Sequence, residues 1–452
     1  MAIVGSGPAG FYTAEHLMKP EDSAVEVDMF DRLPTPFGLV RAGVAPDHPK
    51  IKSVIRVYEK TAAREGFRFF GNVEVGTDIT IDELRERYHC VVFAYGTSVD
   101  RQLGIPGEDL PGSHSATEFV NWYNAHPDFA DHEFDLSCER VVVIGNGNVA
   151  ADVARMLALP RNELEGTDTA DHAIEALAES GVKEILVLGR RGPAQAAFTN
   201  PEVRELGEMT QADIDIEAAE MELDEISRAY VDSDDCEPTN RRNVEIFTEF
   251  SQREPEGKKQ TISLRFLRSP IEIQGDGKVE RIVVGRNELK QGEDGYVSAA
   301  DTGEREEIEC GLVLRSIGYK GVPIEGVPFD EKRGLIPNEA GRVTGEDGLY
   351  AVGWIKRGPS GVIGTNKKDA QDTVNSLFAG LEAQNIPEAP LAGDRGATDA
   401  LLAERKPDHV TYEGWEAIDA AEVERGKPLG RPRVKFCRVE EMVEASKSKT
   451  AA

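Results

Sequence analysis

The stretch Ala2-Ile3-Val4-Gly5-Ser6-Gly7-Pro8-Ala9-Gly10 decides the fold. Its first three residues predict a buried strand, and the apolar residues from Phe11 to Met18 predict a helix directly after the glycines. In a strand–turn–helix of this kind, Gly5 permits the tight turn, Gly7 lets a pyrophosphate approach the backbone, and Gly10 lets the helix pack closely on the strand. The N-terminus of the helix then faces the phosphate charge.

A second strand follows at the position that a dinucleotide-binding fold requires. Val25 to Phe30 predicts this strand, and it ends on Asp31, whose carboxylate can accept hydrogen bonds from the hydroxyls of a ribose. Glycines alone are a weak signal, but the flanking strand, the helix and the terminal acid together make this one specific. Only Met1 precedes the first strand, which raises the expectation of a natural chain that begins earlier.

The same pattern recurs in the middle of the chain. Arg140 to Ile144 predicts another buried strand, which is followed by Gly145-Asn146-Gly147-Asn148-Val149-Ala150 and by a helix through Leu157. Ala150 replaces the third glycine and is still small enough for close packing of helix and strand. The chain therefore holds a second dinucleotide-binding turn.

The strand after this second turn indicates which nicotinamide coenzyme binds. Glu184 to Leu188 predicts the strand, and it ends in Gly189-Arg190-Arg191, without the acid that NAD-dependent enzymes keep there. Arginine offers planar, bidentate pairing to phosphate, so two of them suit the 2′-phosphate of NADP. The alternative is a solvated arginine pair at a strand end, and the glycine turn upstream favours NADP.

Further strands indicate how the chain is organised. They are expected at Cys90–Ala94, Leu312–Ile317 and Gly348–Trp354, and we expect these segments to return the chain to the first sheet. The predicted fold is α/β, with two doubly wound, Rossmann-like dinucleotide-binding domains. Residues 1–105 and 325–452 form the first domain, the latter part with a C-terminal extension, and residues 106–324 form the NADP domain inserted into it.

Composition excludes several classes of protein. No run of about 18 apolar residues occurs among the 452, so we predict no membrane insertion, and no secretory signal precedes the first strand. The net charge of −30 argues against nucleic acid as a partner. The five cysteines lack the spacing of a disulfide framework, a zinc site or an iron–sulfur site, so we expect no metal centre and a cytoplasmic location.

The charge is unevenly distributed along the chain. Residues 202–237 hold 14 acids against only Arg204 and Arg228, and we expect solvated helix faces there. The stretch from Arg41 to Arg68 holds seven bases against three acids. An anionic partner must meet a local basic surface on so acidic a protein, and this stretch is the first candidate for it.

Three longer segments carry a resemblance to a known family. Residues 34–41 (Pro-Thr-Pro-Phe-Gly-Leu-Val-Arg), 43–49 (Gly-Val-Ala-Pro-Asp-His-Pro) and 353–366 resemble the adrenodoxin reductase family, including its actinobacterial ferredoxin reductases. The similarity runs from Gly5 to about Lys435, and it departs from the family pattern at Asn200-Pro201. It implies an FAD-containing oxidoreductase that takes hydride from NADPH and passes single electrons to a separate ferredoxin-type iron–sulfur protein.

The resemblance also implies site residues. His48 and Glu205 fall on a polar couple near the flavin and the nicotinamide, where their role would be orienting and electrostatic. The FAD positions are Ala9, Asp31, Leu39, Val75, Trp354, Gly361, Val362 and Ile363, beside the turn glycines Gly5, Gly7 and Gly10. The NADP positions are Arg101, Asn146, Gly147, Asn148, Val149, Arg190, Arg191, Glu202 and Gly361, beside Gly145.

Two further expectations concern the flavin and the electron acceptor. A helix should follow Gly364, capped by Thr365 or Asn366, and its positive end would stabilise negative charge on a reduced flavin. The docking surface for the iron–sulfur protein would consist of the bases from Arg41 to Arg56, with Arg204, Arg241 and Arg242.

Two other functions remain open from the sequence. One is another NADPH-dependent flavoenzyme, or the electron-supplying subunit of a larger complex. The other is a non-catalytic FAD-binding redox sensor, which the intact second turn and Arg190-Arg191 disfavour. No Cys-x-x-Cys occurs, which argues against a disulfide reductase.

Overall fold

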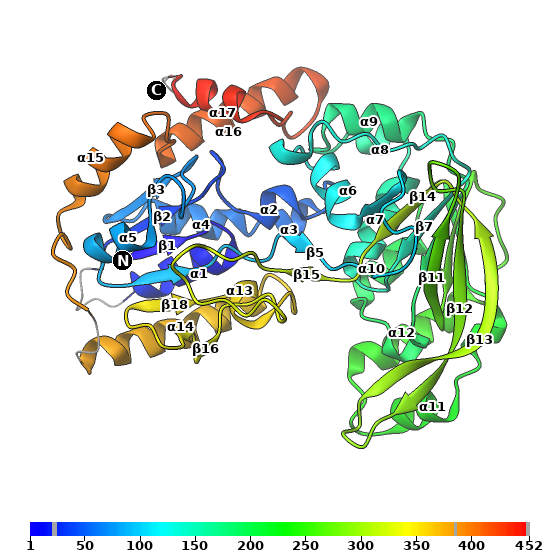
Figure 1. Cartoon of the computed structure of the whole chain (residues 1–452). Helices are drawn as coiled ribbons and strands as arrows, with labels where there is room; N and C mark the ends of the chain where they lie inside the picture. The colour runs from blue at the N-terminus through cyan, green and yellow to red at the C-terminus, as the bar shows by residue number, and fades with distance from the viewer. Residues whose placement is uncertain (20–24, 384–386, 449–452) are drawn as a thin grey trace. The chain divides into compact units, whose positions relative to one another are not determined.

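The computed structural model describes residues 1–19, 25–383 and 387–448, and the chain forms two compact units (Figure 1). Unit 1 consists of Met1–Arg101 and Gly318–Ala452, and unit 2 of Gln102–Ile317. The chain thus leaves the first unit, builds the second, and returns. The junctions lie slightly earlier along the chain than the boundaries at 105 and 324 expected from the sequence.

The sheet of unit 1 has the strand order β16-β17-β18-β4-β1-β2-β3. The strands from β18 to β3 are parallel, while β16 and β17 pair antiparallel at one edge. The bounds of the strands in this unit are β1 (Ala2–Val4), β2 (Val27–Phe30), β3 (Phe67–Phe70), β4 (Val91–Phe93), β5 (Val99–Asp100), β15 (Tyr319–Lys320), β16 (Asn338–Glu339), β17 (Arg342–Val343) and β18 (Leu349–Ala351). The short strands β5 and β15 form a separate antiparallel pair.

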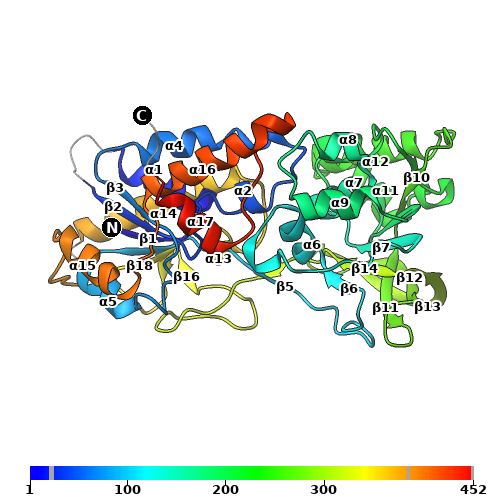
Figure 2. The same cartoon turned by 90° about the horizontal axis from the view of Figure 1, so that it is seen from above.

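The helices of unit 1 cover this sheet. Helix α1 packs against α14, and α16 and α17 lie side by side (Figures 1 and 2). The bounds are α1 (Pro8–Leu17), α2 (Leu39–Ala42), α3 (Pro49–Lys52), α4 (Ile55–Ala62), α5 (Ile81–Arg87), α13 (Trp354–Arg357), α14 (Thr365–Glu382), α15 (Arg395–Arg405), α16 (Tyr412–Gly426) and α17 (Val439–Ser446). Helix α1 begins at Pro8, earlier than the predicted Phe11, because proline at the first helical position already has the φ angle of a helix.

Unit 2 contains a parallel sheet with the strand order β6-β14-β7-β8-β10-β9. The long strands β11, β12 and β13 form an antiparallel sheet beside it (Figure 1). The strand bounds are β6 (Ser113–Ser115), β7 (Arg140–Ile144), β8 (Glu184–Leu188), β9 (Ala212–Asp215), β10 (Gln260–Arg265), β11 (Arg268–Gln274), β12 (Arg281–Gln291), β13 (Val297–Glu309) and β14 (Leu312–Arg315). The helix bounds are α6 (Ala116–Tyr123), α7 (Asn148–Ala158), α8 (Arg161–Leu164), α9 (Asp171–Ala178), α10 (Asn200–Leu206), α11 (Glu225–Asp232) and α12 (Pro238–Phe250).

One predicted strand joins the other sheet. The segment Leu312–Ile317 was expected to return the chain to the first sheet, but β14 pairs with β6 and β7 of unit 2, so that expectation was wrong. The chain returns to unit 1 only at Gly318. An apolar run suits any buried parallel strand, and its pattern does not indicate which of two such sheets it enters. The α/β class with two parallel sheets, one unit inserted in the other, is confirmed.

No helix among the described residues is long and apolar enough to cross a membrane.

Within unit 1, a buried ion pair fixes the C-terminal helix α16 to the N-terminal part of the chain. Arg41 donates to both carboxylate oxygens of Glu422 on α16, at 2.9 and 2.5 Å, and both side chains are buried. The backbone N–H of Phe436 donates to the same carboxylate. Burial by itself raises the pKa of Glu422, but Arg41, Arg433 and the Phe436 N–H together hold the pKa below its usual value. Arg41 is therefore a structural residue, and its expected place in a docking surface was wrong.

Replacing Glu422 with glutamine should destabilise the protein by about 3 kcal/mol at pH 7, because it leaves the Arg41 charge buried without its partner. A carboxyl whose pKa is depressed on folding stabilises the fold above its unfolded pKa of about 4.3, and this contribution is lost as the pH falls through the lower folded value. The melting-temperature difference between Glu422→Gln and the parent protein should thus shrink below about pH 4.3. Glu416→Gln, at an exposed position of the same helix, is the control. Equal melting temperatures at pH 7 would contradict the assignment.

Candidate functional site

The first glycine turn has the geometry of a site for a bound phosphate. Gly5 has φ +106°, and a Cβ atom there would lie 2.6 Å from the backbone of Tyr95. A Cβ atom on Gly10 would lie 2.1 Å from the carbonyl oxygen of Gly5. At Gly7, which caps α1, the nearest atom to such a Cβ is 4.0 Å away. Gly5 and Gly10 thus serve the packing of the turn, whereas Gly7 leaves open space before the helix N-terminus, as a pyrophosphate requires.

Asp31 closes this turn from the end of β2. Its carboxylate accepts hydrogen bonds from the backbone N–H of Ser6 at 2.9 Å and the hydroxyl of Ser6 at 2.5 Å. The backbone N–H of Leu33 donates to its other oxygen at 3.0 Å. Oδ2 thus accepts two hydrogen bonds and Oδ1 only one, so Oδ1 has a further lone pair for the predicted contact with a ribose hydroxyl. The sequence did not predict that Asp31 also ties the first turn to the second strand.

Other predicted FAD positions lie around the same turn. A Cβ atom on Gly353 would come within 2.6 Å of the methyl group of Ala9, so the segment before Trp354 packs directly on α1. The backbone N–H of Phe37 donates to Ser6, which places the start of α2 and its half-exposed Leu39 beside the turn. Val75 is buried, in the segment after β3, where the Val73 N–H donates to the Asp31 carbonyl. The structure therefore brings these residues together at one edge of the sheet.

Trp354 has a polar atom that suits a ligand. Its ring stacks on Tyr319, with the ring centroids 5.8 Å apart. Its indole Nε1–H is buried and has no hydrogen-bond partner among the described residues. Because buried donors are nearly always paired, this one indicates an acceptor that the protein chain itself does not supply. Asp369 fixes the preceding turn by accepting from the Gly353 N–H at 2.6 Å.

The loop before α14 is open, but its cap differs from the prediction. Val362 is 57% exposed, a large fraction for an apolar side chain. Helix α14 begins at Thr365, and its cap is Gly364, so the expected caps Thr365 and Asn366 were wrong. The Thr365 hydroxyl instead accepts from the Val362 N–H at 3.1 Å, because Thr365 already lies in the first helical turn. This end of α14 can therefore offer a negative charge its helix dipole, but not a set of free backbone N–H groups.

Unit 2 repeats the geometry of the first turn. Gly145 has φ +132°, and a Cβ atom there would lie 2.1 Å from the carbonyl oxygen of Ser316. At Gly147, the cap of α7, the nearest atom to such a Cβ is 3.9 Å away. The amide Nδ2 of Asn146 is buried without a hydrogen-bond partner among the described residues. The side chain of Asn148 accepts from the Thr199 N–H at 2.8 Å, so it serves the protein's own structure.

Arg190 and Arg191 follow β8 at the same edge of the sheet. Their carbonyl oxygens are held by the Asn287 side chain at 2.8 Å and by the Leu267 N–H at 3.1 Å. Within the described part of the chain, neither guanidinium has an ion pair or hydrogen bond. The backbone is thus fixed while both charges are available to an anion.

A buried arginine beside this turn was not predicted from the sequence. Arg155 on α7 pairs with Asp152, Glu202 and Glu205, at 2.8, 3.3 and 3.5 Å. Its side chain is only 3% exposed. An arginine within the otherwise apolar stretch of α7, three residues after an acid, was the signal that could have found it.

The remaining predicted residues are distributed over both units. His48 caps the short helix α3, and the Arg101 N–H donates to the Gly318 carbonyl, both within unit 1. Glu202 and Glu205 belong to unit 2. The pairing of His48 with Glu205 therefore stays a prediction.

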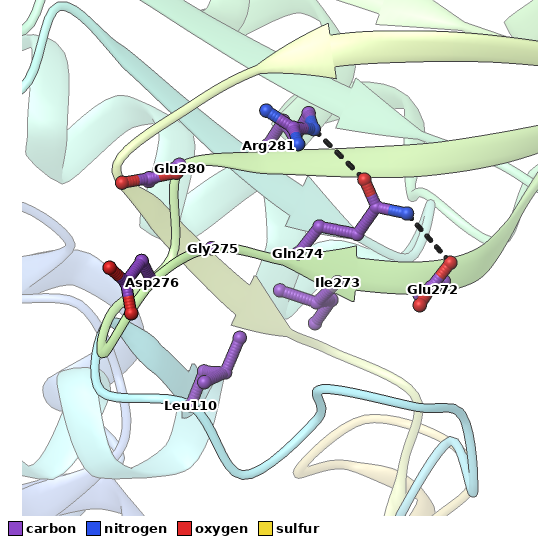
Figure 3. A pocket seen from close by; sticks show the side chains of 8 residues that line it. All are labelled: Leu110, Glu272, Ile273, Gln274, Gly275, Asp276, Glu280 and Arg281. Carbon is purple, nitrogen blue, oxygen red and sulfur yellow. Dashed lines mark hydrogen bonds between the residues drawn. The ribbon is translucent and has the colours of Figure 1, made fainter.

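An open pocket of about 560 Å³ lies elsewhere in unit 2 (Figure 3). Figure 3 shows Arg281, Gln274 and Glu272 joined by hydrogen bonds along its wall. Asp276 and Glu280 add further negative charge, so the pocket does not suit an anionic dinucleotide. None of the predicted site residues lines it.

Comparisons with known proteins agree with this geometry. The family model "Pyridine nucleotide-disulphide oxidoreductase" matches residues 1–186. The NADPH-ferredoxin reductase FprA of Mycobacterium leprae is 51% identical over 98% of this chain and 97% of its own. The human mitochondrial NADPH:adrenodoxin oxidoreductase is 43% identical over 98% of this chain and 91% of its own. The solved structure of Mycobacterium tuberculosis FprA in complex with NADPH superimposes with a TM-score of 0.93, at 50% identity and 99% coverage of both chains.

Proposed function

We propose that this chain, which belongs to the family of NADPH-ferredoxin and adrenodoxin reductases, is an FAD-containing NADPH:ferredoxin oxidoreductase. It takes hydride from NADPH and delivers single electrons to a separate ferredoxin-type iron–sulfur protein. The observation that carries the proposal is the pair of matching turns, at Gly7 and Gly147, each open before a helix N-terminus. Two such turns in one chain suit two dinucleotides, and the free Arg190-Arg191 pair suits the phosphate that distinguishes NADP.

Unit 1 is the proposed FAD domain. The residues that would hold the cofactor are Gly7, Asp31, Leu39 and Trp354 around the first turn, with the loop 361–363 before α14. The unpaired indole N–H of Trp354 and the open space at Gly7 fit such a group. Bound FAD supplies the ability to accept two electrons as hydride and to release them one at a time.

Unit 2 is the proposed NADP domain. Gly147 and the N-terminus of α7 would bind the pyrophosphate, and Arg190 and Arg191 the 2′-phosphate. We propose that His48 and Glu205 orient the reacting groups, without a covalent or acid–base role, since hydride transfer itself requires neither. A cytoplasmic location fits the five cysteines, none of which forms a disulfide in the described part of the chain.

The acceptor needs a basic surface on an acidic protein. We define the α3–α4 patch as Lys50, Lys52, Arg56 and Lys60 with the exposed apolar side chains of Ile51 and Val57. In the described part of the chain Lys50, Arg56 and Lys60 have no ion-pair partner. Arg242 of unit 2, by contrast, pairs with Glu245, and Arg241 donates to carbonyls of its own unit. The α3–α4 patch is therefore the better candidate for docking an acidic iron–sulfur protein.

If the protein is an NADPH:ferredoxin oxidoreductase, two linked results are expected. NADPH should bleach the flavin absorbance under anaerobic conditions, and cytochrome c should be reduced rapidly only when a ferredoxin is added. Bleaching without ferredoxin-dependent reduction would favour another NADPH-dependent flavoenzyme. A flavin that NADPH does not bleach would favour a redox sensor and contradict the proposal.

Reversing charge in the α3–α4 patch should weaken docking alone. Lys50→Glu combined with Arg56→Glu should raise the Michaelis constant for ferredoxin about tenfold, roughly 1.4 kcal/mol. The NADPH-to-ferricyanide rate should not change, because it uses no protein partner. The ferredoxin-dependent rate should also pass through a maximum with ionic strength, since salt screens the long-range repulsion from a net charge of −30 before it screens close pairing.

Reversal at Arg241 and Arg242 is the matched control. If that change weakens ferredoxin binding and the α3–α4 change does not, the docking face lies on unit 2.

A further inference from the structure

We propose that Arg155 is a positioning residue for the coenzyme, and that it acts by fixing Glu202. The inference rests on the proposed function, because Glu202 is a predicted NADP position. Arg155 itself is buried behind the acids and would not touch the coenzyme. Its role would be to hold a carboxylate where the coenzyme can use it.

The contacts of Arg155 join α7, which follows the second glycine turn, to the neighbouring helix α10. One guanidinium nitrogen donates to Asp152 on its own helix at 2.8 Å. The other lies 3.3 Å from Glu202 and 3.5 Å from Glu205, which face α7 from the same side of α10 because they are three residues apart. The guanidinium thus bridges α7 and α10.

The N-terminus of α10 is fixed by a separate contact. The Thr199 N–H, just before α10, donates to the Asn148 side chain at the first residue of α7. Helix α10 packs against α7 between these two contacts. With Asn148 at one end and Arg155 at the acidic face, α10 has little freedom to move relative to the helix that carries the glycine turn.

Charge explains why this arrangement depends on Arg155. One guanidinium stands among three carboxylates, and the Glu202 side chain is only 11% exposed. Without the arginine, Glu202 would lose its ion pair to α7 while still lying beside other acids, so its carboxylate would be held less firmly in place. The coenzyme would then lose an acceptor at a defined position.

The chemistry of the coenzyme indicates which part Glu202 would serve. A carboxylate repels phosphate and accepts hydrogen bonds from neutral donors. The adenosine end of NADP carries a 3′-hydroxyl and an adenine amino group, but its 2′-phosphate repels a carboxylate, so Glu202 suits the hydroxyls of the nicotinamide ribose or the carboxamide. Loss of Arg155 should therefore affect the whole coenzyme and leave binding of the adenosine bisphosphate fragment nearly unchanged.

The test compares Arg155→Met and Arg155→Lys in the FAD-loaded protein. We expect Arg155→Met to slow anaerobic flavin reduction by NADPH about 100-fold, the scale of an effect from misplaced groups. Calorimetry should show weakened NADP⁺ binding with unchanged binding of adenosine 2′,5′-bisphosphate. Arg155→Lys, which keeps the positive charge but lacks the planar guanidinium group, should recover part of the rate.

A double-mutant cycle separates positioning from general loss of stability. If Arg155 acts through Glu202, Arg155→Met should cost little further rate in a Glu202→Gln background. Independent, multiplying losses would overturn the proposal. So would equal loss of adenosine 2′,5′-bisphosphate binding, or a lysine variant no better than methionine. Failure of the parent protein to be reduced by NADPH would instead refute the proposed function.

Discussion

Replacing Gly7 with valine is expected to yield a folded protein that no longer retains FAD. Gly7 has φ −76°, a backbone conformation open to any residue, and beyond its two chain neighbours no protein atom lies closer than 4.0 Å to the position of a new Cβ. The protein therefore has no steric need for glycine at this position. A pyrophosphate at the N-terminus of α1 would need that space, so side-chain carbon atoms there should exclude it. Alanine should weaken FAD binding less than valine does.

The comparison with Gly5 and Gly147 makes this result specific. Gly5→Val should lower the stability of the protein itself, because its φ is positive and the Tyr95 backbone blocks the Cβ. Gly147→Val should leave the protein yellow and impair NADPH binding. The measurements are flavin absorbance of the purified protein, circular dichroism and melting temperature. A yellow Gly7→Val protein with normal FAD content would show that the first turn is not the flavin site.

The sequence predicted those features that depend on local pattern. Strands β7 and β8 have the predicted bounds, and both glycine turns lead into helices. Such segments are predictable because a buried parallel strand, a glycine turn and a helix each leave a signature within about ten residues. The resemblance to a family supplied Leu39, Val75 and Trp354, which have no such signature.

Features that depend on contacts between distant segments were not predictable in this way. Arg41 belongs to a basic stretch of sequence, yet its partner Glu422 lies far along the chain and buries it. Arg155 and Glu202 are likewise brought together by the packing of α10 on α7. A charge seen in sequence gives no indication of whether folding will pair it, because pairing is decided by tertiary structure.

The acidic stretch 202–237 is a further example. It was expected to form solvated helix faces, but several of its acids are engaged in the fold. Asp213 accepts from the backbone N–H groups of residues 256–258. Glu220 accepts from the Phe266 N–H and pairs with Arg265 and Arg268. Glu220 thus neutralises arginines near the end of β10, next to β8, whereas Arg190 and Arg191 remain as unpaired charges there.

Because Arg190 and Arg191 are unpaired while the arginines near them are paired, we expect these two residues to determine the preference for NADPH over NADH. Replacing both Arg190 and Arg191 with glutamine should weaken NADPH binding at least 100-fold and change NADH binding little. Each charge-assisted hydrogen bond to the 2′-phosphate is worth roughly 1.5–3 kcal/mol, and two of them give roughly 3–6 kcal/mol. The backbone at these residues is held by Asn287 and Leu267 through carbonyl groups, so the loop should persist when the side chains change.

Arg265→Gln is the matched control, because Arg265 lies at the end of the neighbouring strand but is already paired with Glu217 and Glu220. It should leave the ratio of NADPH to NADH affinity unchanged, while the double variant lowers that ratio by two orders of magnitude or more. The ratio is measured from flavin reduction at varied concentrations of each coenzyme, with melting temperature recorded for every variant. Equal damage to NADPH and NADH would mean that the pair serves the fold, because a missing phosphate contact cannot affect a coenzyme that lacks the phosphate.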